Sequence, residues 1–104
     1  MKFTELETYI SDSSVVVADK EQIFSDIGGE AVILHLKTGI YHGLNEIGAR
    51  IWTLIQEPKA VKDIKYILLE EYEVETERCD RDLIALLNDL LAAGLIEVKN
   101  ETNA

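Results

Sequence analysis

The chain has 104 residues, of which 47% are hydrophobic, and this size and composition predict one domain with a single core. Its formal net charge of −10 argues against nucleic-acid binding, because contacts to phosphates need clustered Lys and Arg. Cys79 is the only cysteine, so an internal disulfide is excluded and a cytoplasmic location is predicted. No stretch approaches the roughly 20 apolar residues of a membrane span, so no membrane partner is expected.

The sequence predicts a folded domain over residues 15–98, between a flexible N-terminal tail (1–14) and a C-terminal tail (99–104). The domain begins with Val15-Val16-Val17, a short β-branched run that is compatible with an extra strand or with an extended lead-in. A run of this length does not distinguish the two.

Three strand-like runs follow, separated by turn signals. Residues 21–27 form the first run, with Ile23 and Ile27 on one face and Phe24 on the other. Gly28-Gly29 predicts a turn into the strongest strand, residues 30–36, and Lys37-Thr38-Gly39 predicts the next turn, into residues 40–44. Because both turns are short, an antiparallel meander is expected.

The chain then becomes helical. Asn45 is a suitable N-cap for the first helix, and Pro58 stops it. Thr76 can cap the third helix, and Gly94 is a suitable residue just after its end. We expect helices from Asn45 to about Gln56, about 60–72 and 76–93, and a short extended end at 95–98.

Three short strands followed by three helices predict an α+β domain. The second and third helices, joined by a short connection, have helix-turn-helix proportions, so the complete prediction is a winged helix-turn-helix. This fold often binds DNA, but the predicted recognition helices carry Glu70, Glu71, Glu77, Asp80 and Asp82, which argue against it.

The residue types that could support catalysis are poorly placed. Acidic neighbours raise the pKa of Cys79 and make it a weak nucleophile. His35 and His42 lie on facing runs of one hairpin, but two histidines without a third ligand are weak evidence for a metal. Gly28-Gly29 opens no helix and so forms no phosphate loop. We therefore expect no enzyme activity, no cofactor and no metal.

The third predicted helix has a wide apolar surface. At about 100° per residue, its leucines and Ile84 spread over roughly 160°, whereas a helix with one buried face needs about 100°. In one interpretation the helix is central and packs on two sides. In the other, the flank made by Ile84, Leu87 and Leu91 lines a groove for something outside the chain. The two interpretations are compatible.

The last predicted strand has an unprotected edge. Edge strands are usually protected from pairing with another chain by a charged residue, a proline or a bulge. The run Gly39-Ile40-Tyr41-His42-Gly43-Leu44 contains neither a charged residue nor a proline. Its glycines leave room for another backbone. An apolar groove beside such an edge is suited to a peptide that binds as an added strand.

Several motifs, in order and at matching spacing, resemble the PqqD-like family of RiPP recognition elements. These are small winged helix-turn-helix modules that recognise peptides in the biosynthesis of ribosomally made, modified peptides. They are G-x-Y-x-x-L-N at Gly39–Asn45, G-x-x-I-W at Gly48–Trp52, and L-x-x-x-G-L-I at Leu90–Ile96. The resemblance covers about Glu21 to Val98. It is greatest to the free-standing recognition half of split lasso-peptide leader-processing systems.

This resemblance implies that the chain binds the leader of a precursor peptide on its third strand and against its last helix. A separate cysteine peptidase would then remove the leader. The alternatives are a carrier for the pyrroloquinoline quinone precursor, a winged-helix transcription regulator, and a structural subunit of a larger enzyme. The residues assigned to peptide binding are Gly39, Ile40, Tyr41, His42, Gly43, Asp80, Ile84, Leu87 and Leu91.

Overall fold

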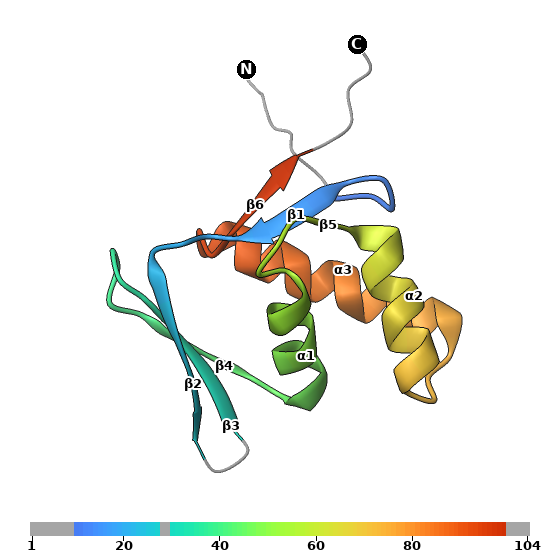
Figure 1. Cartoon of the computed structure of the whole chain (residues 1–104), viewed down its shortest axis with the longest axis horizontal. Coiled ribbons are helices and arrows are strands. Elements are labelled where there is room, and N and C mark those ends of the chain that lie inside the picture. The colour runs from blue at the N-terminus through green and yellow to red at the C-terminus, as the bar shows by residue number, and fades with distance from the viewer. Residues whose placement is uncertain (1–9, 28–29, 100–104) are drawn as a thin grey trace.

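The computed structural model describes residues 10–27 and 30–99, which form three helices and two three-stranded antiparallel sheets (Figure 1). The predicted turn at Gly28-Gly29, most of the N-terminal tail and residues 100–104 lie outside the described residues. The α+β class and the helix-turn-helix are confirmed, and a second sheet is added. The elements are β1 (Val15–Ala18), β2 (Gln22–Ile27), β3 (Glu30–His35), β4 (Tyr41–Leu44), α1 (Glu46–Leu54), β5 (Lys59–Ala60), α2 (Val61–Glu71), α3 (Thr76–Ala92) and β6 (Ile96–Lys99).

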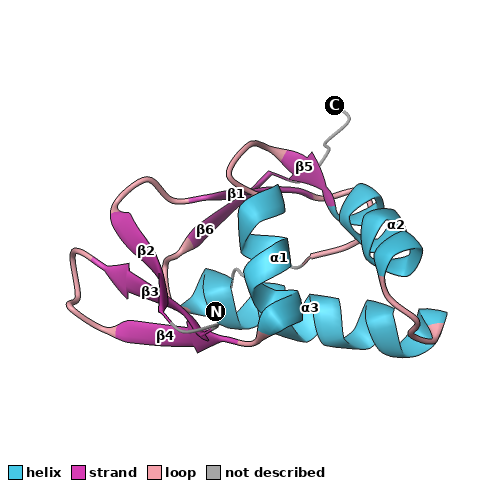
Figure 2. Cartoon of the chain, turned by 60° about the horizontal axis from the view of Figure 1, so that its bottom comes forward, coloured by secondary structure: helices cyan, strands magenta, loops and turns pink. Residues whose placement is uncertain are grey.

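The predicted meander is the sheet β2-β3-β4, which projects to one side of the helices (Figure 2). Ala31, Ile33 and His35 of β3 are buried on the face toward the core. The connection from β3 to β4 contains Gly39, whose φ of 72° is left-handed and favours glycine. This turn closes with hydrogen bonds from the Gly39 N–H to the His35 oxygen (2.8 Å) and from the His35 N–H to the Ile40 oxygen (3.0 Å).

The second sheet, β5-β1-β6, joins the two ends of the domain. Val15 pairs with Lys99 and Ala18 with Ile96, so the valine run is a strand and the extended end is its partner. The two-residue strand β5, which the sequence did not predict, pairs with the other side of β1. Val16 is fully buried between these strands and the helices, and it ties this sheet to the core.

Helix α1 begins where β4 ends, with a single residue between them. The Asn45 side chain caps it as predicted, because its Oδ1 accepts a hydrogen bond of 2.8 Å from the Gly48 N–H. A Cβ on Gly48 would lie 3.2 Å from that Oδ1 and 3.3 Å from the Leu44 Cδ2, so this close approach favours glycine. Trp52 and Ile55 anchor α1 in the core at 1% and 0% exposure.

Helix α3 lies behind α1 and is crossed by α2 near one end (Figure 1). Its buried residues are Cys79, Leu83, Leu87 and Leu90. The prediction that Thr76 caps this helix was wrong, because Glu75 occupies the N-cap and makes no side-chain capping bond. Gly94 follows the helix with φ 77°, as predicted. The wide apolar arc is therefore explained in large part by a central helix that packs on several sides.

Part of the predicted N-terminal tail packs against the domain. Ile10 is 8% exposed and belongs to the core cluster, and Ser14 is fully buried. Asp12 forms an ion pair of 3.0 Å with Lys65 of α2, which also pairs with Asp80 of α3 at 2.9 Å. These two hydrogen-bonded carboxylates raise the pKa of Lys65.

No helix in the described part of the chain has both the length and the apolar character needed to span a membrane.

Candidate functional site

The candidate site begins at the outer edge of β4. Within the described residues, β4 pairs with β3 on one side and with no strand on the other. The pairing is antiparallel, with Ile33 opposite His42 and Val32 opposite Gly43. In such a ladder, every second residue directs its N–H and C=O groups to the partner strand, and the residues between direct theirs outward.

The hydrogen bond from the His35 N–H to the Ile40 oxygen shows which residues point outward. It makes His35–Ile40 a hydrogen-bonded position, so His42 and Leu44 also direct their backbone groups to β3. Tyr41 and Gly43 consequently present their N–H and C=O groups at the open edge. The backbone N–H of His42, a residue that the sequence assigned to peptide binding, therefore faces the central strand β3 and not the open edge.

Strand β2 is the other open edge of this sheet. By the same alternation, the bond from the Leu36 N–H to the Glu21 oxygen (3.1 Å) directs the backbone groups of Gln22, Phe24 and Asp26 outward. A shallower hollow of about 530 Å³ lies on the outer face of the sheet, lined only by strand residues such as Ile23 and Ile27 of β2, whereas the helices line the hollow beside β4. The two edges therefore differ in what lies next to them.

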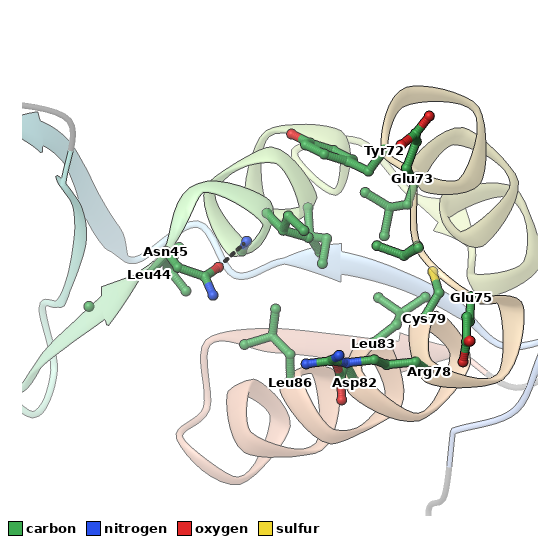
Figure 3. A pocket seen from close by; sticks show the side chains of 16 residues that line it. Leu44, Asn45, Tyr72, Glu73, Glu75, Arg78, Cys79, Asp82, Leu83 and Leu86 are labelled. Atoms are coloured by element: carbon green, nitrogen blue, oxygen red, sulfur yellow. Dashed lines mark hydrogen bonds and ion pairs between the residues drawn. The ribbon is translucent and has the colours of Figure 1, made fainter.

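A groove of about 780 Å³ lies where β4 meets the helices (Figure 3). The end of β4 and the start of α1 form one wall, the turn between α2 and α3 forms another, and the first half of α3 forms the floor. Most of its interior is aliphatic. The lining residues are Gly43, Leu44, Asn45, Ile47, Gly48, Ile51, Leu68, Tyr72, Glu73, Val74, Glu75, Arg78, Cys79, Asp82, Leu83 and Leu86.

Helix α3 presents to this groove a different flank from the one that we assigned from the sequence. Leu83 and Leu86 line it, whereas Ile84 and Leu91 do not. Leu87 is fully buried in the core. The reason is the rotation of the helix, since residues 83 and 86 lie on one side of the buried Leu87 and residues 84 and 91 on the other at 100° per residue.

The remaining assigned residues divide between the edge and the far flank of α3. Gly43 belongs to both the edge and the groove, and the Tyr41 side chain is 68% exposed on the outer face of the sheet. Ile40 is 55% exposed just before the strand begins. Asp80 pairs with Lys65, so its carboxylate connects α3 to α2 and does not line the groove.

One hydrogen bond holds the sheet at a fixed place relative to α3. The His35 Nδ1 accepts from the Lys37 N–H (3.2 Å), so the proton lies on Nε2, which donates to the Gly94 oxygen (3.2 Å). His35 is 4% exposed. The buried ring therefore joins the β3–β4 hairpin to the end of α3, and it fixes the distance across which the groove opens.

A paired guanidinium and carboxylate brace the opposite wall. The Arg50 Nε and Nη2 donate to the two Glu71 oxygens at 2.9 and 2.7 Å, and this joins α1 to the end of α2. The hydrogen bond from Arg50 lowers the pKa of Glu71, and the same bond raises the pKa of Arg50. The pair is surface-exposed, so its main effect is to orient the two helices around the groove.

The acidic residues Glu73 and Glu75 lie at the end of the groove away from β4, and Arg78 and Asp82 lie beside Leu86 (Figure 3). Arg78 pairs with Asp82 across one helical turn at 3.6 Å. Glu73 and Glu75 have no ion-pair partner among the described residues. Cys79 lies at the floor, 7% exposed, where burial above all raises the pKa of its thiol. It therefore stays protonated at neutral pH.

Comparison with known proteins agrees with this architecture. Residues 30–96 match the family described as Coenzyme PQQ synthesis protein D (PqqD), and no curated protein sequence matches the chain. A solved structure of TbiB1 in complex with the TbiA(beta) leader peptide is 36% identical, with a TM-score of 0.71, and the match covers 78% of this chain and 94% of that one. A lasso peptide synthetase B1 complexed with the leader peptide is 27% identical, with a TM-score of 0.70, and the match covers 79% of this chain and 96% of that one.

The site and fold define a winged helix-turn-helix domain with an open strand edge beside an apolar groove. Since the family match spans well over half of the sequence, the chain belongs to the PqqD family. The resemblance to PqqD-like recognition elements seen in the sequence motifs is thereby confirmed.

Proposed function

We propose that this chain binds the leader segment of a ribosomal precursor peptide in lasso-peptide biosynthesis. The leader adds to the sheet as a strand on β4 and places a side chain in the groove above α3. The observation that carries the proposal is the coincidence of the two features, because the outward groups of Gly43 lie at the mouth of the groove. The two solved structures that the chain resembles both contain a leader peptide.

Strand addition suits this edge for a physical reason. The backbone groups of Tyr41 and Gly43 offer donors and acceptors to a peptide of any sequence, and the groove supplies the side-chain selection. Asn45, Gly48 and His35 hold β4 between α1 and α3. The protein side is therefore largely ordered before binding, and most of the ordering entropy falls on the peptide.

Hydrogen exchange tests this assignment. The probe is a lasso-precursor leader peptide, such as the TbiA(beta) leader that is bound in the related complex. We expect slowed exchange over residues 40–44 and the first half of α3 when the leader is bound, because their amides become covered. If slower exchange appears only in β2, the peptide binds at the β2 edge and the proposed binding at β4 is refuted.

In the same proposal, the chain delivers the bound leader in the cytoplasm to a separate cysteine leader peptidase. Supporting this, the outer face of the β2-β3-β4 sheet is apolar and uncovered, with Ile23 at 51% and Ile27 at 71% exposure. A leader strand on β4 would extend that same face. A second protein that docks there would contact the sheet and the leader together.

A reconstituted pair tests the delivery step. Ile23→Asp and Ile27→Asp should weaken stimulation of leader removal while leader affinity stays within about threefold, because neither residue lines the groove. Tyr66→Asp is the matched control, since Tyr66 is 66% exposed on α2 and away from the sheet. Equal activity of all three variants would contradict docking on this face.

A second candidate is the carrier of a pyrroloquinoline quinone precursor, which the description of the matched family favours. The lasso assignment is preferred because the two structures described above are leader complexes, one of them named as a lasso peptide synthetase. Side-by-side binding of a lasso leader and a pyrroloquinoline quinone precursor peptide would separate the two, and tighter binding of the second would reverse the preference.

A further inference from the structure

The acidic end of the groove contains more negative charge than the fold requires. Residues 70–82 contain seven acidic and two basic side chains, a formal charge of −5, which is half that of the whole chain. This segment comprises the end of α2, the turn, and the start of α3. Two of its carboxylates, Glu73 and Glu75, line the groove directly, at the end opposite Leu44 and Asn45 (Figure 3).

Local structure accounts for only part of this charge. Glu75 is the N-cap residue of α3 and Glu77 is in its first turn, where the helix dipole favours carboxylates. Glu70 and Glu71 lie in the last turn of α2, where the dipole opposes them and no basic residue is present. Arg50 compensates Glu71. Glu73 has neither a helix dipole nor an ion pair to account for it within the described residues.

The groove is otherwise apolar, so a peptide that enters it meets two environments. Beside Gly43 and Leu44 its side chains contact aliphatic carbon, and toward the turn they meet Glu73 and Glu75. The one guanidinium in the lining, Arg78, is already paired with Asp82. A Lys or Arg of the peptide would therefore find two free carboxylates there, while an Asp or Glu would meet like charge.

We propose that this domain selects leader segments that carry an apolar anchor for the part of the groove beside Leu44 and, near that anchor, a Lys or Arg that reaches toward Glu73 and Glu75. This inference rests on the proposed leader binding and specifies the chemistry of the leader. The open edge and the groove make the site, and Glu73 with Glu75 set the charge that it prefers. The strong negative field of the domain would also speed the encounter with such a peptide.

A displayed library of random peptides, about 12 residues long, tests this without knowledge of the natural precursor. It is selected in parallel on the parent protein, on a Glu73→Gln/Glu75→Gln double variant, and on a Glu57→Gln/Glu97→Gln control. The control removes the same number of negative charges from exposed positions outside the groove. It therefore separates the local charge of the groove from the net charge of the chain.

We expect the parent and the control to enrich peptides that carry Lys or Arg near an apolar residue. The Glu73→Gln/Glu75→Gln variant should keep the apolar preference and lose the basic one. For the most enriched peptide, this variant should bind about threefold to tenfold more weakly than the control at low salt, since two exposed ion pairs are lost. The gap should close as salt shortens the screening length.

Two results would overturn the inference. Enrichment of apolar peptides without Lys or Arg, or an unchanged basic preference in the double variant, would refute the charge selection and leave leader binding standing. Failure of every variant to enrich any peptide would refute the proposed leader binding and this inference with it. A thermal melt of the double variant near that of the control excludes misfolding as the cause of a loss.

Discussion

Replacing Gly43 by proline removes one backbone donor from the open edge and nothing from the ladder to β3. Gly43 faces Val32 at a position where the backbone groups of β4 point outward. Proline is tolerated at such edge positions, and the preceding residue, His42, already has the extended backbone that proline requires of it. The Gly43→Pro variant should therefore fold and lose leader binding.

The size of the loss follows from the hydrogen bond that is deleted. A backbone hydrogen bond contributes about 0.5–1.5 kcal/mol net, and the peptide carbonyl left without its donor costs about 1–3 kcal/mol if it is buried against β4. Because the second figure already includes the lost bond, a central value of about 2 kcal/mol applies, which corresponds to an affinity roughly 30-fold weaker. The proline ring also occupies the space where the peptide backbone would lie, so this is a lower bound.

The assay is fluorescence polarisation with a labelled leader peptide, beside urea unfolding followed by circular dichroism. Gly43→Ala is the matched control, because a Cβ there meets no atom within 4 Å and the N–H is kept. His42→Pro is the opposite case, since its donor faces β3 and its loss should lower the unfolding free energy. If Gly43→Pro is folded and binds the leader within about threefold of Gly43→Ala, strand addition on β4 is refuted.

Four further outcomes follow from the same geometry. Leu86→Gln should weaken leader binding about tenfold or more and Ile84→Gln less than about threefold, because only the first lines the groove; polarisation titrations would show equal losses if the flank is misassigned. Cys79→Ala should leave leader removal by a reconstituted peptidase unchanged, since the pKa of this buried thiol is raised and a thiolate does not form at neutral pH; a tenfold loss in a folded variant would contradict this. Because the hydrogen bond from Arg50 lowers the pKa of Glu71, the pair stabilises the fold fully above the unfolded pKa of about 4.3, and this contribution is lost as pH falls through the lower folded pKa. Glu71→Gln should therefore destabilise the fold near pH 7, and urea unfolding should show that this destabilisation shrinks as the pH is lowered below about 4.3. The net charge of −10 predicts no saturable, sequence-dependent binding to duplex DNA at about 0.15 M salt, which a gel shift checks.

The local elements of the fold could be predicted from the sequence because their signals are local. The run of residues 30–36, with alternate side chains on opposite faces, was enough to predict β3, although it did not show which face is buried. The glycine at 39 satisfied the left-handed turn, the side chain at 45 capped α1, and the glycine at 94 ended α3. In each case one or two residues meet a backbone requirement that few others meet.

The second sheet and the rotation of α3 were not accessible in this way. Val15 and Lys99 lie at opposite ends of the domain, and β5 has two residues, so no periodicity joins them. The helix periodicity showed that α3 has a wide apolar arc, but the arc has two flanks with similar residues. Which flank faces the groove depends on how α3 packs against α1, α2 and β6, and this packing involves the whole core rather than the local sequence.

The position of His35 indicates why the open edge and the groove act as one site. Its ring is fixed at both nitrogens, by the Lys37 N–H and by the Gly94 oxygen. The first bond belongs to the hairpin that carries β4 and the second to the turn that ends α3. Because the ring is buried, breaking either bond would leave a polar group without a partner, which costs about 1–3 kcal/mol. The backbone donors of the edge and the apolar floor of the groove are thereby held at one separation, so a peptide that satisfies the first is positioned to fill the second.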